Sequence, residues 1–474
     1  MGTVSHGAGR LAFSTAINGA LQCSEADRDK MLRKILTLGQ KYMSGEKFDF
    51  DFQGMSEMLE DEEGTLNQYV KRLFDEIHPN VLKTTLLNLG FEAFFHGTKT
   101  TRKMRERYQC NVPWVILMDP TSACNLHCTG CWAAEYGNKL NLSFEEMDHV
   151  IEQGKELGIY FYMFTGGEPL VRKADILRLC KKHHDCVFLA YTNGTLVDEV
   201  LCREMQRMGN FYLAISLEGF DEVNDLRRGE GVFRKVMDAM DLLKEYGLIF
   251  GTSICYTSKN AETVVSDEFV DLLVEKGNRY ALYFHYMPVG NDAAVELLPS
   301  VEQRKMMYHR VREIRDMRHG KGLFTMDFQN DGEYVGGCIA GGRNYFHINA
   351  NGDAEPCVFI HYSNANIRTH TLLEILKQPI FMAYRDHQPF NKNHLRPCPM
   401  LENPEFLAKL VQETGAKSTD LQSPEAPEHL CAKCHEYAKN WAPCAEELWE
   451  EKPHTKRSYE NYKAEKEEKT KSVS

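Results

Sequence analysis

The sequence predicts an α/β protein in which six parallel strands form a partial (β/α)6 TIM-like barrel. From residue 111 onward, apolar stretches of strand length alternate with amphipathic stretches of helical length. Strands that alternate with helices at this spacing pair in parallel through right-handed crossovers. The strand candidates are residues 112–118, 159–164, 187–191, 212–217, 249–256 and 280–287, and the helix candidates between them are 144–157, 174–183, 198–208 and 232–246.

Before and after this alternating region, the sequence pattern is different. The segment before it is predicted to be helical, and the segment after it is rich in loops and cysteines. One hairpin is predicted over 344–359, because Asn351-Gly352 supplies the positive φ that a tight turn needs. The expected regions are a helical one at 1–110, the barrel at 111–320, a loop-rich cysteine domain at 321–450 and a charged, disordered tail at 451–474.

The composition is that of a globular protein. A length of 474 residues implies two to four domains. Hydrophobic residues make up 43% and charged residues 26%, which excludes a disordered, collagen-like or membrane-bundle protein. The 56 basic and 68 acidic side chains give a formal charge of −12, which argues against a nucleic-acid partner.

Fifteen cysteines are the unusual feature of this composition. An odd number without a recognisable signal peptide argues against a disulfide framework, and no stretch reaches the roughly 18 apolar residues of a membrane span. We therefore expect a cytoplasmic protein in which clustered cysteines bind metal or carry redox chemistry. Six isolated cysteines are expected to be packing residues, namely Cys23, Cys110, Cys180, Cys186, Cys202 and Cys255.

A helix that Pro79 opens combines an apolar face with a basic end. Core packing with a solvated basic face is the simpler interpretation. The alternative is peripheral contact with a membrane, in which apolar residues enter the lipid and basic residues meet anionic headgroups. The apolar residues are Val81, Leu82, Leu86, Leu87, Leu89, Phe91, Phe94 and Phe95, and the basic ones are Lys99, Arg102, Lys103, Arg105 and Arg107.

Cys124, Cys128 and Cys131 form a compact group directly after the first predicted strand. Three thiolates on a short loop can each bind one iron of a [4Fe–4S] cube, which leaves the fourth iron open to a cofactor or substrate. A partial zinc site is the alternative, although zinc sites usually pair two Cys-x-x-Cys halves that lie apart in the sequence.

This Cys-x3-Cys-x2-Cys pattern after the first strand resembles the signature of the radical S-adenosylmethionine (radical SAM) superfamily. The resemblance implies that S-adenosylmethionine binds the open iron through its amino and carboxylate groups. An electron from the reduced cluster then cleaves the sulfonium, and the resulting 5′-deoxyadenosyl radical abstracts a hydrogen from an unactivated position. The protein's task is to place the cofactor near the cluster and to exclude competing reactions.

Motifs at the ends of later strands resemble the family's cofactor-binding positions. After the second strand, Gly166 and Gly167 would let the backbone approach the ligand, and Glu168 would accept from its ammonium group. A plain turn is the alternative interpretation of these three residues alone. After the fourth strand, Ser216 and Glu218 resemble the residues that bind the ribose hydroxyls.

Three further residues complete the expected cofactor site. Arg228 would bind the methionyl carboxylate, with a solvated basic side chain as the alternative, while Ser253 lies on the fifth strand and Val289 would form an apolar wall for adenine. One position departs from the family, because the aromatic residue that usually precedes the third cysteine and contacts adenine is Gly130 here. Trp132 follows the cysteine instead, so we expect the adenine contact to be rebuilt.

Six cysteines in the last third resemble the SPASM-like extension that holds auxiliary iron–sulfur clusters in many of these enzymes. Gly352 followed by Cys357, and the Cys-x2-Cys pair at 431–434, match its elements. Six thiolates provide for one full cube with two spare ligands, or for two cubes that each have an open or non-cysteine position. Structural zinc is the competitor. The expected ligands are Cys338, Cys357, Cys398, Cys431, Cys434 and Cys444.

These features predict a radical SAM oxidoreductase that abstracts hydrogen from an unactivated C–H bond of a peptide or protein. Its electrons would come from a donor such as a ferredoxin or flavodoxin. The first alternative is the same chemistry on a lipid or acyl chain at a membrane surface, which the apolar helix motivates. The second is a multi-cluster electron-transfer protein without a substrate, which would leave the motifs at the strand ends unexplained.

Overall fold

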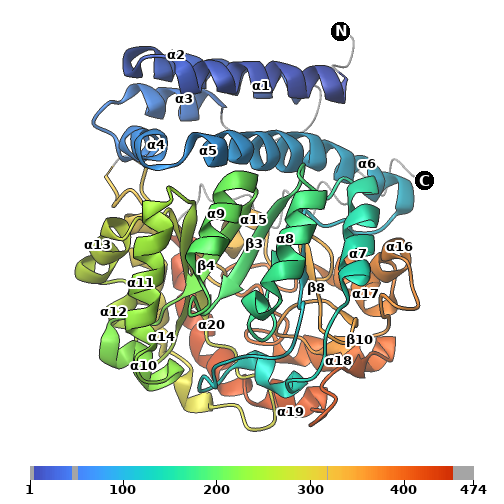
Figure 1. The fold of residues 1–474 in the computed structure, drawn as a ribbon. Coiled ribbons are helices and arrows are strands. Elements are labelled where there is room, and N and C mark those ends of the chain that lie inside the picture. The colour runs from blue at the N-terminus through green and yellow to red at the C-terminus, as the bar shows by residue number, and fades with distance from the viewer. Residues whose placement is uncertain (1–4, 45–51, 318, 452–474) are drawn as a thin grey trace.

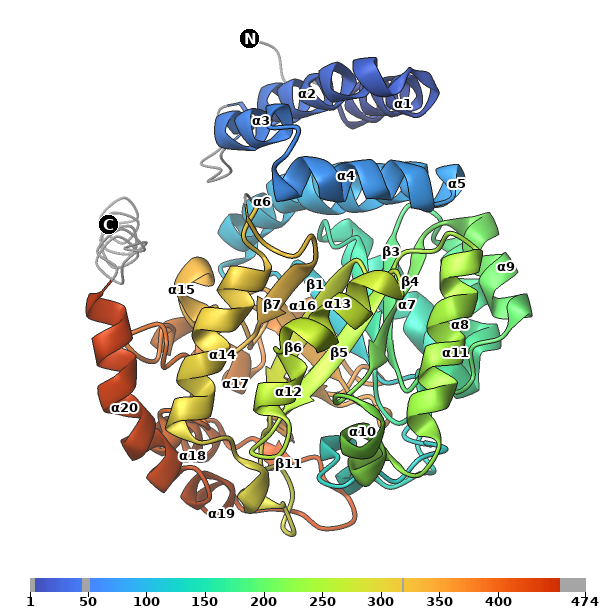
Figure 2. The same cartoon turned by 90° about the vertical axis from the view of Figure 1, so that its left-hand side faces the viewer.

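The computed structural model describes residues 5–44, 52–317 and 319–451. From residue 452 onward, the predicted disordered tail lies outside the described residues. A nine-stranded sheet forms the centre, helices cover its outer side, and a helical layer lies across one end (Figures 1 and 2).

All six predicted strands are present, and each pairs in parallel with the next. The sheet order is β7-β6-β5-β4-β3-β2-β1-β8-β9, with its two edge strands unpaired to each other. The expected partial barrel is therefore confirmed, and it has more strands than the six expected. The strands are β1 Val115–Met118, β2 Phe161–Phe164, β3 Val187–Thr192, β4 Phe211–Ser216, β5 Phe250–Tyr256, β6 Tyr280–His285, β7 Phe324–Asp327, β8 Tyr345–Ile348 and β9 Ala354–Glu355.

The strands read as short apolar runs because helices and loops cover both faces of this parallel sheet. β1 is buried at all four of its positions and lies between β2 and β8. The sequence did not predict β7, which has only four residues at the edge of the sheet, and its first residue, Phe324, is exposed.

The helices between the strands begin where their capping residues predict. Ser143 and Glu146 form a capping box at the start of α7, and Ser300 and Gln303 form another at α14. The four predicted helices agree with α7, α8, α9 and α11 to within one residue at each end. The helices are α7 Phe144–Glu156, α8 Lys173–Lys182, α9 Glu199–Met208, α10 Asp221–Arg228, α11 Val232–Glu245, α12 Ala261–Val264, α13 Asp267–Glu275 and α14 Val301–Ile314.

The C-terminal region shares the sheet rather than forming a separate body. The predicted hairpin is present as β8 and β9, with Gly352 at a φ of +85° in its turn, and β8 pairs in parallel with β1. The sheet thus runs across the boundary predicted at residue 320. The remaining elements here are α15 Gly332–Val335, α16 Leu372–Leu376, α17 Pro379–His387, α18 Pro404–Thr414, α19 Pro427–Ala432, α20 His435–Glu450 and the short strands β10 Tyr362–Ser363 and β11 Lys417–Ser418.

The N-terminal region is helical, as predicted, and lies across the amino ends of the strands (Figure 1). Asn80 donates to two carbonyls at the end of α9, and the His78 amide donates to the carbonyl of Gly247 just before β5. The opposite end of the sheet, where the strands terminate, stays free for the cysteine loops. The helices are α1 His6–Gln22, α2 Glu25–Tyr42, α3 Phe52–Glu60, α4 Thr65–Glu76, α5 Pro79–Thr85, the π-helix η1 Leu86–Gly97 and α6 Thr98–Tyr108.

The apolar residues of η1 do not face a lipid surface. Phe91 and Phe95 are buried in a core with Phe13 and Ile17 of α1. At the basic end, Arg105 donates to the carbonyl of Val112. The structure therefore supports core packing and removes the motive for the membrane alternative. No helix within the described ranges is long and apolar enough to cross a membrane.

Replacing Phe91 with alanine tests this core. Phe91 is fully buried, and its ring packs against those of Phe13 and Tyr42. We expect Phe91→Ala to lower the free energy of unfolding by about 3–5 kcal/mol, measured by denaturant or thermal unfolding. The control is Leu11→Ala on α1, whose side chain is 69% exposed, and an equal effect of both changes would contradict this packing.

Candidate active site

The three clustered cysteines lie on the loop that follows β1, at the carboxyl end of the sheet. Cys124 is exposed, while Cys128 and Cys131 are half-buried. The Thr129 amide between them donates to the carbonyl of Arg227 at 3.0 Å, so the end of α10 holds the loop in place. Although Cys124 is exposed as a residue, desolvation at its sulfur raises the pKa of the thiol to about 11, and desolvation also raises the pKa of Cys128.

The glycine pair after β2 allows two segments of this chain to pack against each other. A Cβ atom at Gly166, whose φ is +99°, would lie 2.5 Å from the carbonyl oxygen of Thr121, and one at Gly167 would lie 2.2 Å from that of Ala123. The Gly167 amide donates to the Thr121 carbonyl at 3.0 Å. Both glycines thus make room for the segment that leads into Cys124, and their close approach to the cofactor stays a prediction.

Glu168 is buried, and its carboxylate is engaged by groups of the protein. The Thr192 hydroxyl and the Asn193 amide both donate to it at 2.7 Å, and the Leu170 amide does so at 2.9 Å. Burial raises the pKa of Glu168, and these three donors oppose that shift. The carboxylate therefore joins the ends of β2 and β3, and its contact with the ammonium group of the cofactor stays a prediction.

Glu218 and Arg228, which were predicted to bind different parts of one ligand, bind each other. Glu218 is fully buried and forms ion pairs with Arg228 and, at 2.7 Å, with Arg227. A buried carboxylate needs such partners, and two guanidinium groups satisfy it here. Arg228 also donates to the sulfur of Cys128 at 3.9 Å and opposes the rise that burial causes in the pKa of that thiol.

The inner surface of β4 and β5 supplies further polar groups. Ser216 and Ser253 are half-buried and occupy the same register position on neighbouring strands. Cys255 lies two residues beyond Ser253, hence on the same face, and it is not the isolated packing residue that was predicted. Burial raises its pKa to about 11, while the nearby charge of Arg227 lowers it. The period-two spacing from Ser253 was the signal that could have identified it.

There is a steric reason why Gly130 occupies the position at which the family usually has an aromatic residue. Gly130 has a φ of +67°, and a Cβ atom there would lie 2.8 Å from a ring carbon of Tyr286, which follows β6. An aromatic side chain does not fit at this position because the Tyr286 ring already fills the space. Trp132 turns the other way and packs edge-to-face against Phe359, with ring centroids 6.2 Å apart. Val289 is buried near the end of the same segment.

Three of the predicted auxiliary ligands, Cys338, Cys357 and Cys398, lie together around two tyrosines. The Tyr345 hydroxyl lies 2.7 Å from the sulfur of Cys357. The Tyr384 hydroxyl is buried and has no hydrogen-bond partner among the described residues. It lies close enough to all three thiols and to Cys431 for their charges to affect its pKa. A buried donor without a partner among several thiols is what a bound cluster would satisfy.

The other three auxiliary candidates divide into a pair and a single residue. Cys431 and Cys434 are both buried at the junction of α19 and α20, where the Cys434 amide donates to the Cys431 carbonyl at 2.9 Å. Cys444 lies further along α20, and the charges that act most strongly on it are those of Lys305 and Glu447 rather than other thiols. The structure thus brings five of these six cysteines toward one region and leaves Cys444 apart.

The spacing of the thiols argues against a single zinc ion. Four thiolates at about 2.3 Å from zinc hold their sulfurs about 3.8 Å apart. Among the residues that the structure describes, no three cysteine sulfurs lie within 4.8 Å of one another. A cube binds each thiolate to a different iron and so needs a wider spacing. As they stand, the thiols of both groups are spaced too widely for one zinc ion to bind three of them.

A fully buried charged network lies between the two thiol groups. His347 on β8 contacts Asp119 after β1 at 2.9 Å and Glu355 on β9 at 2.7 Å. Tyr136 donates to Glu355 at 2.8 Å. Burial alone would lower the pKa of His347, but the two carboxylates raise it to about 10. A charged imidazolium therefore joins the segment before the first cysteine loop to the hairpin before the auxiliary thiols.

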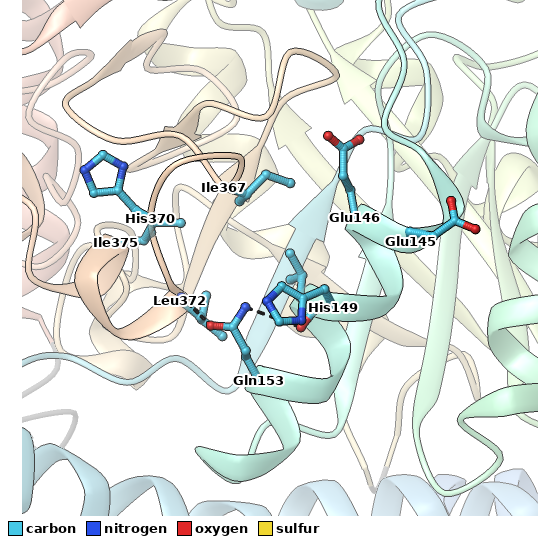
Figure 3. A pocket seen from close by; sticks show the side chains of 9 residues that line it. Glu145, Glu146, His149, Gln153, Ile367, His370, Leu372 and Ile375 are labelled. Atoms are coloured by element: carbon cyan, nitrogen blue, oxygen red, sulfur yellow. Dashed lines mark hydrogen bonds between the residues drawn. The ribbon is translucent and has the colours of Figure 1, made fainter.

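A cavity of about 270 Å³ lies on the outer side of the barrel, between α7 and the segment around α16 (Figure 3). His149 and Gln153 of α7 face this segment, and Gln153 accepts from the Leu372 amide at 2.8 Å. None of the predicted site residues lines this cavity, so it is separate from the candidate active site.

Replacing Gly167 with alanine should disrupt the first cysteine loop. The new methyl group would collide with the Ala123 carbonyl, which is backbone and cannot turn away. We expect the variant to lose about four iron atoms per chain after anaerobic reconstitution, measured by iron and sulfide analysis. Gly90→Ala is the control, because a Cβ atom there meets nothing within 4 Å. Full iron content in Gly167→Ala would contradict the close approach.

The His347 network should make stability depend on alkaline pH. Because the folded-state pKa of about 10 exceeds the usual 6.5, its stabilisation is complete below about pH 6.5 and is lost as the pH rises through about 10. We expect His347→Gln to be less stable than the wild type at pH 7, with a difference that shrinks toward pH 10 in thermal unfolding. The control is His387→Gln at an exposed site. Parallel pH profiles of His347→Gln and the wild type would contradict the role of this ion pair.

Comparison with known proteins agrees with this geometry. The family model for the radical SAM superfamily matches residues 118–284, and the model for an iron–sulfur cluster-binding domain, SPASM, matches residues 338–400. The chain is 26% identical over 321 residues to the Fe-coproporphyrin III synthase of Methanosarcina barkeri, covering 60% of this chain and 79% of the relative. It is 27% identical over 293 residues to the PqqA peptide cyclase of Granulibacter bethesdensis, covering 58% and 76%.

The crystal structure of Streptococcus suis SuiB bound to S-adenosylmethionine has a similar fold. The two structures superpose with a TM-score of 0.55 at 16% identity, covering 85% of this chain and 93% of that one. A radical SAM domain binds a [4Fe–4S] cluster and S-adenosylmethionine, and a SPASM domain binds auxiliary iron–sulfur clusters. The chain therefore carries a radical SAM domain over residues 118–284 and a SPASM domain over residues 338–400, and it is an enzyme.

Proposed function

We propose that this enzyme abstracts hydrogen from an unactivated C–H bond of a peptide or protein. The observation that carries the proposal is the presence of a three-cysteine loop at the carboxyl end of the sheet together with a second group of half-buried and buried thiols. An open cluster supports cofactor cleavage, and a separate cluster can accept an electron or hold a substrate.

When bound, the first cluster and S-adenosylmethionine supply the radical that takes the hydrogen. The protein's part is to hold the cysteine loop and to line the space in front of it. Glu168, Glu218 and Arg228 act as positioning residues in this proposal, because their charged groups bind one another and neighbouring protein groups. Ser216 and Ser253 then remain as side-chain donors for the cofactor.

The auxiliary site is proposed to use the three thiols around Tyr384, with the fourth ligand from the Cys431–Cys434 pair. The charges of four thiols, those of Cys338, Cys357, Cys398 and Cys431, all raise the pKa of Tyr384. This common neighbour supports one shared cluster at this position. Cys444 lies outside that group. Electrons for both clusters would come from a low-potential donor such as a ferredoxin or flavodoxin.

The proposed substrate class rests on the enzymes to which this chain is similar in sequence. Similarity to a peptide cyclase over 76% of its length supports a peptide. Similarity to an Fe-coproporphyrin III synthase over 79% of its length favours a tetrapyrrole as the second candidate. The lipid alternative has no support from the structure, since the apolar face of η1 is buried against α1.

Cofactor cleavage is the first test of this function. We expect anaerobically reconstituted protein to form 5′-deoxyadenosine from S-adenosylmethionine and dithionite, detected by liquid chromatography. Cys128→Ala should lower the rate at least 100-fold, because a cube that has lost one of three ligands is not held in place. Cys23→Ala is the control, since Cys23 lies on the N-terminal layer, far along the chain from both thiol groups.

The same assay with deuterated candidates separates the substrates. Deuterium should appear in 5′-deoxyadenosine when a perdeuterated peptide substrate is present, and the porphyrin should give none. Transfer from the porphyrin alone would overturn the peptide assignment. Absence of 5′-deoxyadenosine from fully reconstituted protein would overturn the proposed function itself.

A further inference from the structure

Three potential metal ligands meet in the N-terminal helical layer, at the opposite end of the sheet from the cysteine loops. His6 begins α1, and Glu92 and His96 lie four residues apart on the π-helix η1. One ligand atom from each of these side chains lies within 4.8 Å of the other two. This is the one such group among the residues that the structure describes, and the function proposed above makes no use of it.

Glu92 is a buried carboxylate in an otherwise apolar core. It is 1% exposed, although its neighbours include the aromatic rings of Phe91 and Phe95. One carboxylate oxygen lies 2.8 Å from Nε2 of His6, and the other pairs with Arg10. Burying a carboxylate is costly unless it is paired or binds a metal ion, and here His6 and Arg10 supply the pairing in the absence of an ion.

The Nε2 atom of His96 can donate a lone pair to a metal ion. Its Nδ1 lies 3.1 Å from the Tyr42 hydroxyl, which leaves Nε2 available on the other side of the ring. Burial lowers the pKa of His96 to about 4, and the nearby charges of His6, Lys103 and Lys99 lower it further.

The local structure also favours a site. η1 spans twelve residues of π-helix, a conformation that is rare and is found frequently at functional sites. The rings of His6 and His96 are stacked, with centroids 3.9 Å apart, so the His6 ring has to turn out of this stack for both imidazoles to bind one ion in their ring planes. The His6 side chain is 45% exposed, which gives an ion access from solvent.

We propose that His6, Glu92 and His96 bind one divalent transition-metal ion at the interface of α1 and η1. Two imidazoles and one carboxylate suit zinc or a similar ion, whereas calcium and magnesium prefer oxygen ligands. Arg10 and Tyr42 are the outer partners of Glu92 and His96, an arrangement typical of metal sites. The ion would fasten α1 to η1 and replace the His6–Glu92 hydrogen bond.

The positive charges around the site narrow the choice of ion. Arg10 contacts Glu92, and Lys99 and Lys103 act on His96. These three positive charges repel a cation at the site, so only an ion with strong affinity for imidazole nitrogen would bind. This again favours zinc over the alkaline-earth ions. The inference does not depend on the proposed function, because none of these residues belongs to either thiol group.

The test is zinc uptake by reconstituted enzyme whose cysteines already hold iron. Protein is dialysed anaerobically against buffered zinc, and zinc and iron are measured together by mass spectrometry. We expect the wild type to hold about one more zinc ion per chain than a variant with His6→Ala and His96→Ala, at equal iron content. His387→Ala, at an exposed site on α17, is the matched control and should keep the wild-type zinc content. Equal zinc in the wild type and the double variant would overturn the proposal.

A second variant decides the question if the double variant does not fold. Tyr42→Phe keeps the ring in the core and removes only the hydroxyl that holds His96. Loss of such an outer partner lowers metal affinity by about 10–100-fold, so the variant should bind zinc that much more weakly in competition with a chromophoric chelator. Affinity equal to that of the wild type would overturn the site.

Discussion

Strand β1 is the constraint on which the arrangement of both metal regions depends. It pairs in parallel with β2 on one side and with β8 on the other, although β8 lies more than two hundred residues later in the chain. The carboxyl ends of parallel strands meet at one edge of the sheet. The first cysteine loop, the glycine pair after β2 and the hairpin before Cys357 therefore converge at the end of this one buried strand.

Polar groups at that edge are satisfied mainly by one another. Asp119, His347 and Glu355 form a buried chain of charges that crosses from β1 to β9. Glu218 with its two arginines does the same between β4 and α10. Buried charges without partners would be costly, so each charged group pairs with an opposite charge of the protein, although both Asp119 oxygens lack a hydrogen bond among the described residues. What remains open in front of the cysteine loop is a short set of serines, thiols and backbone groups.

The structure confirms the positions that the sequence predicted for the motifs and adds protein partners for their side chains. Strand periodicity placed residues 165–169 and 216–219 at strand ends, and the structure confirms those places. The partners of Glu168, Glu218 and Arg228 were not predictable, because they come from segments that only the fold brings near. Cys255 was misjudged for the same reason. Its environment depends on Arg227 from a different element, while its own neighbours in sequence are apolar.

The amino-acid sequence by itself determined the chemistry, since three cysteines at fixed spacing on one loop can bind a cube wherever the rest of the chain lies. It also determined the parallel sheet, because period-two and helical patterns are local properties. Only the tertiary structure decided that the apolar helix after Pro79 packs inside the protein, that five auxiliary cysteines approach one another without Cys444, and that His6 reaches Glu92 and His96. These outcomes depend on contacts between segments that are distant in the sequence, and such contacts produce no periodic pattern in it.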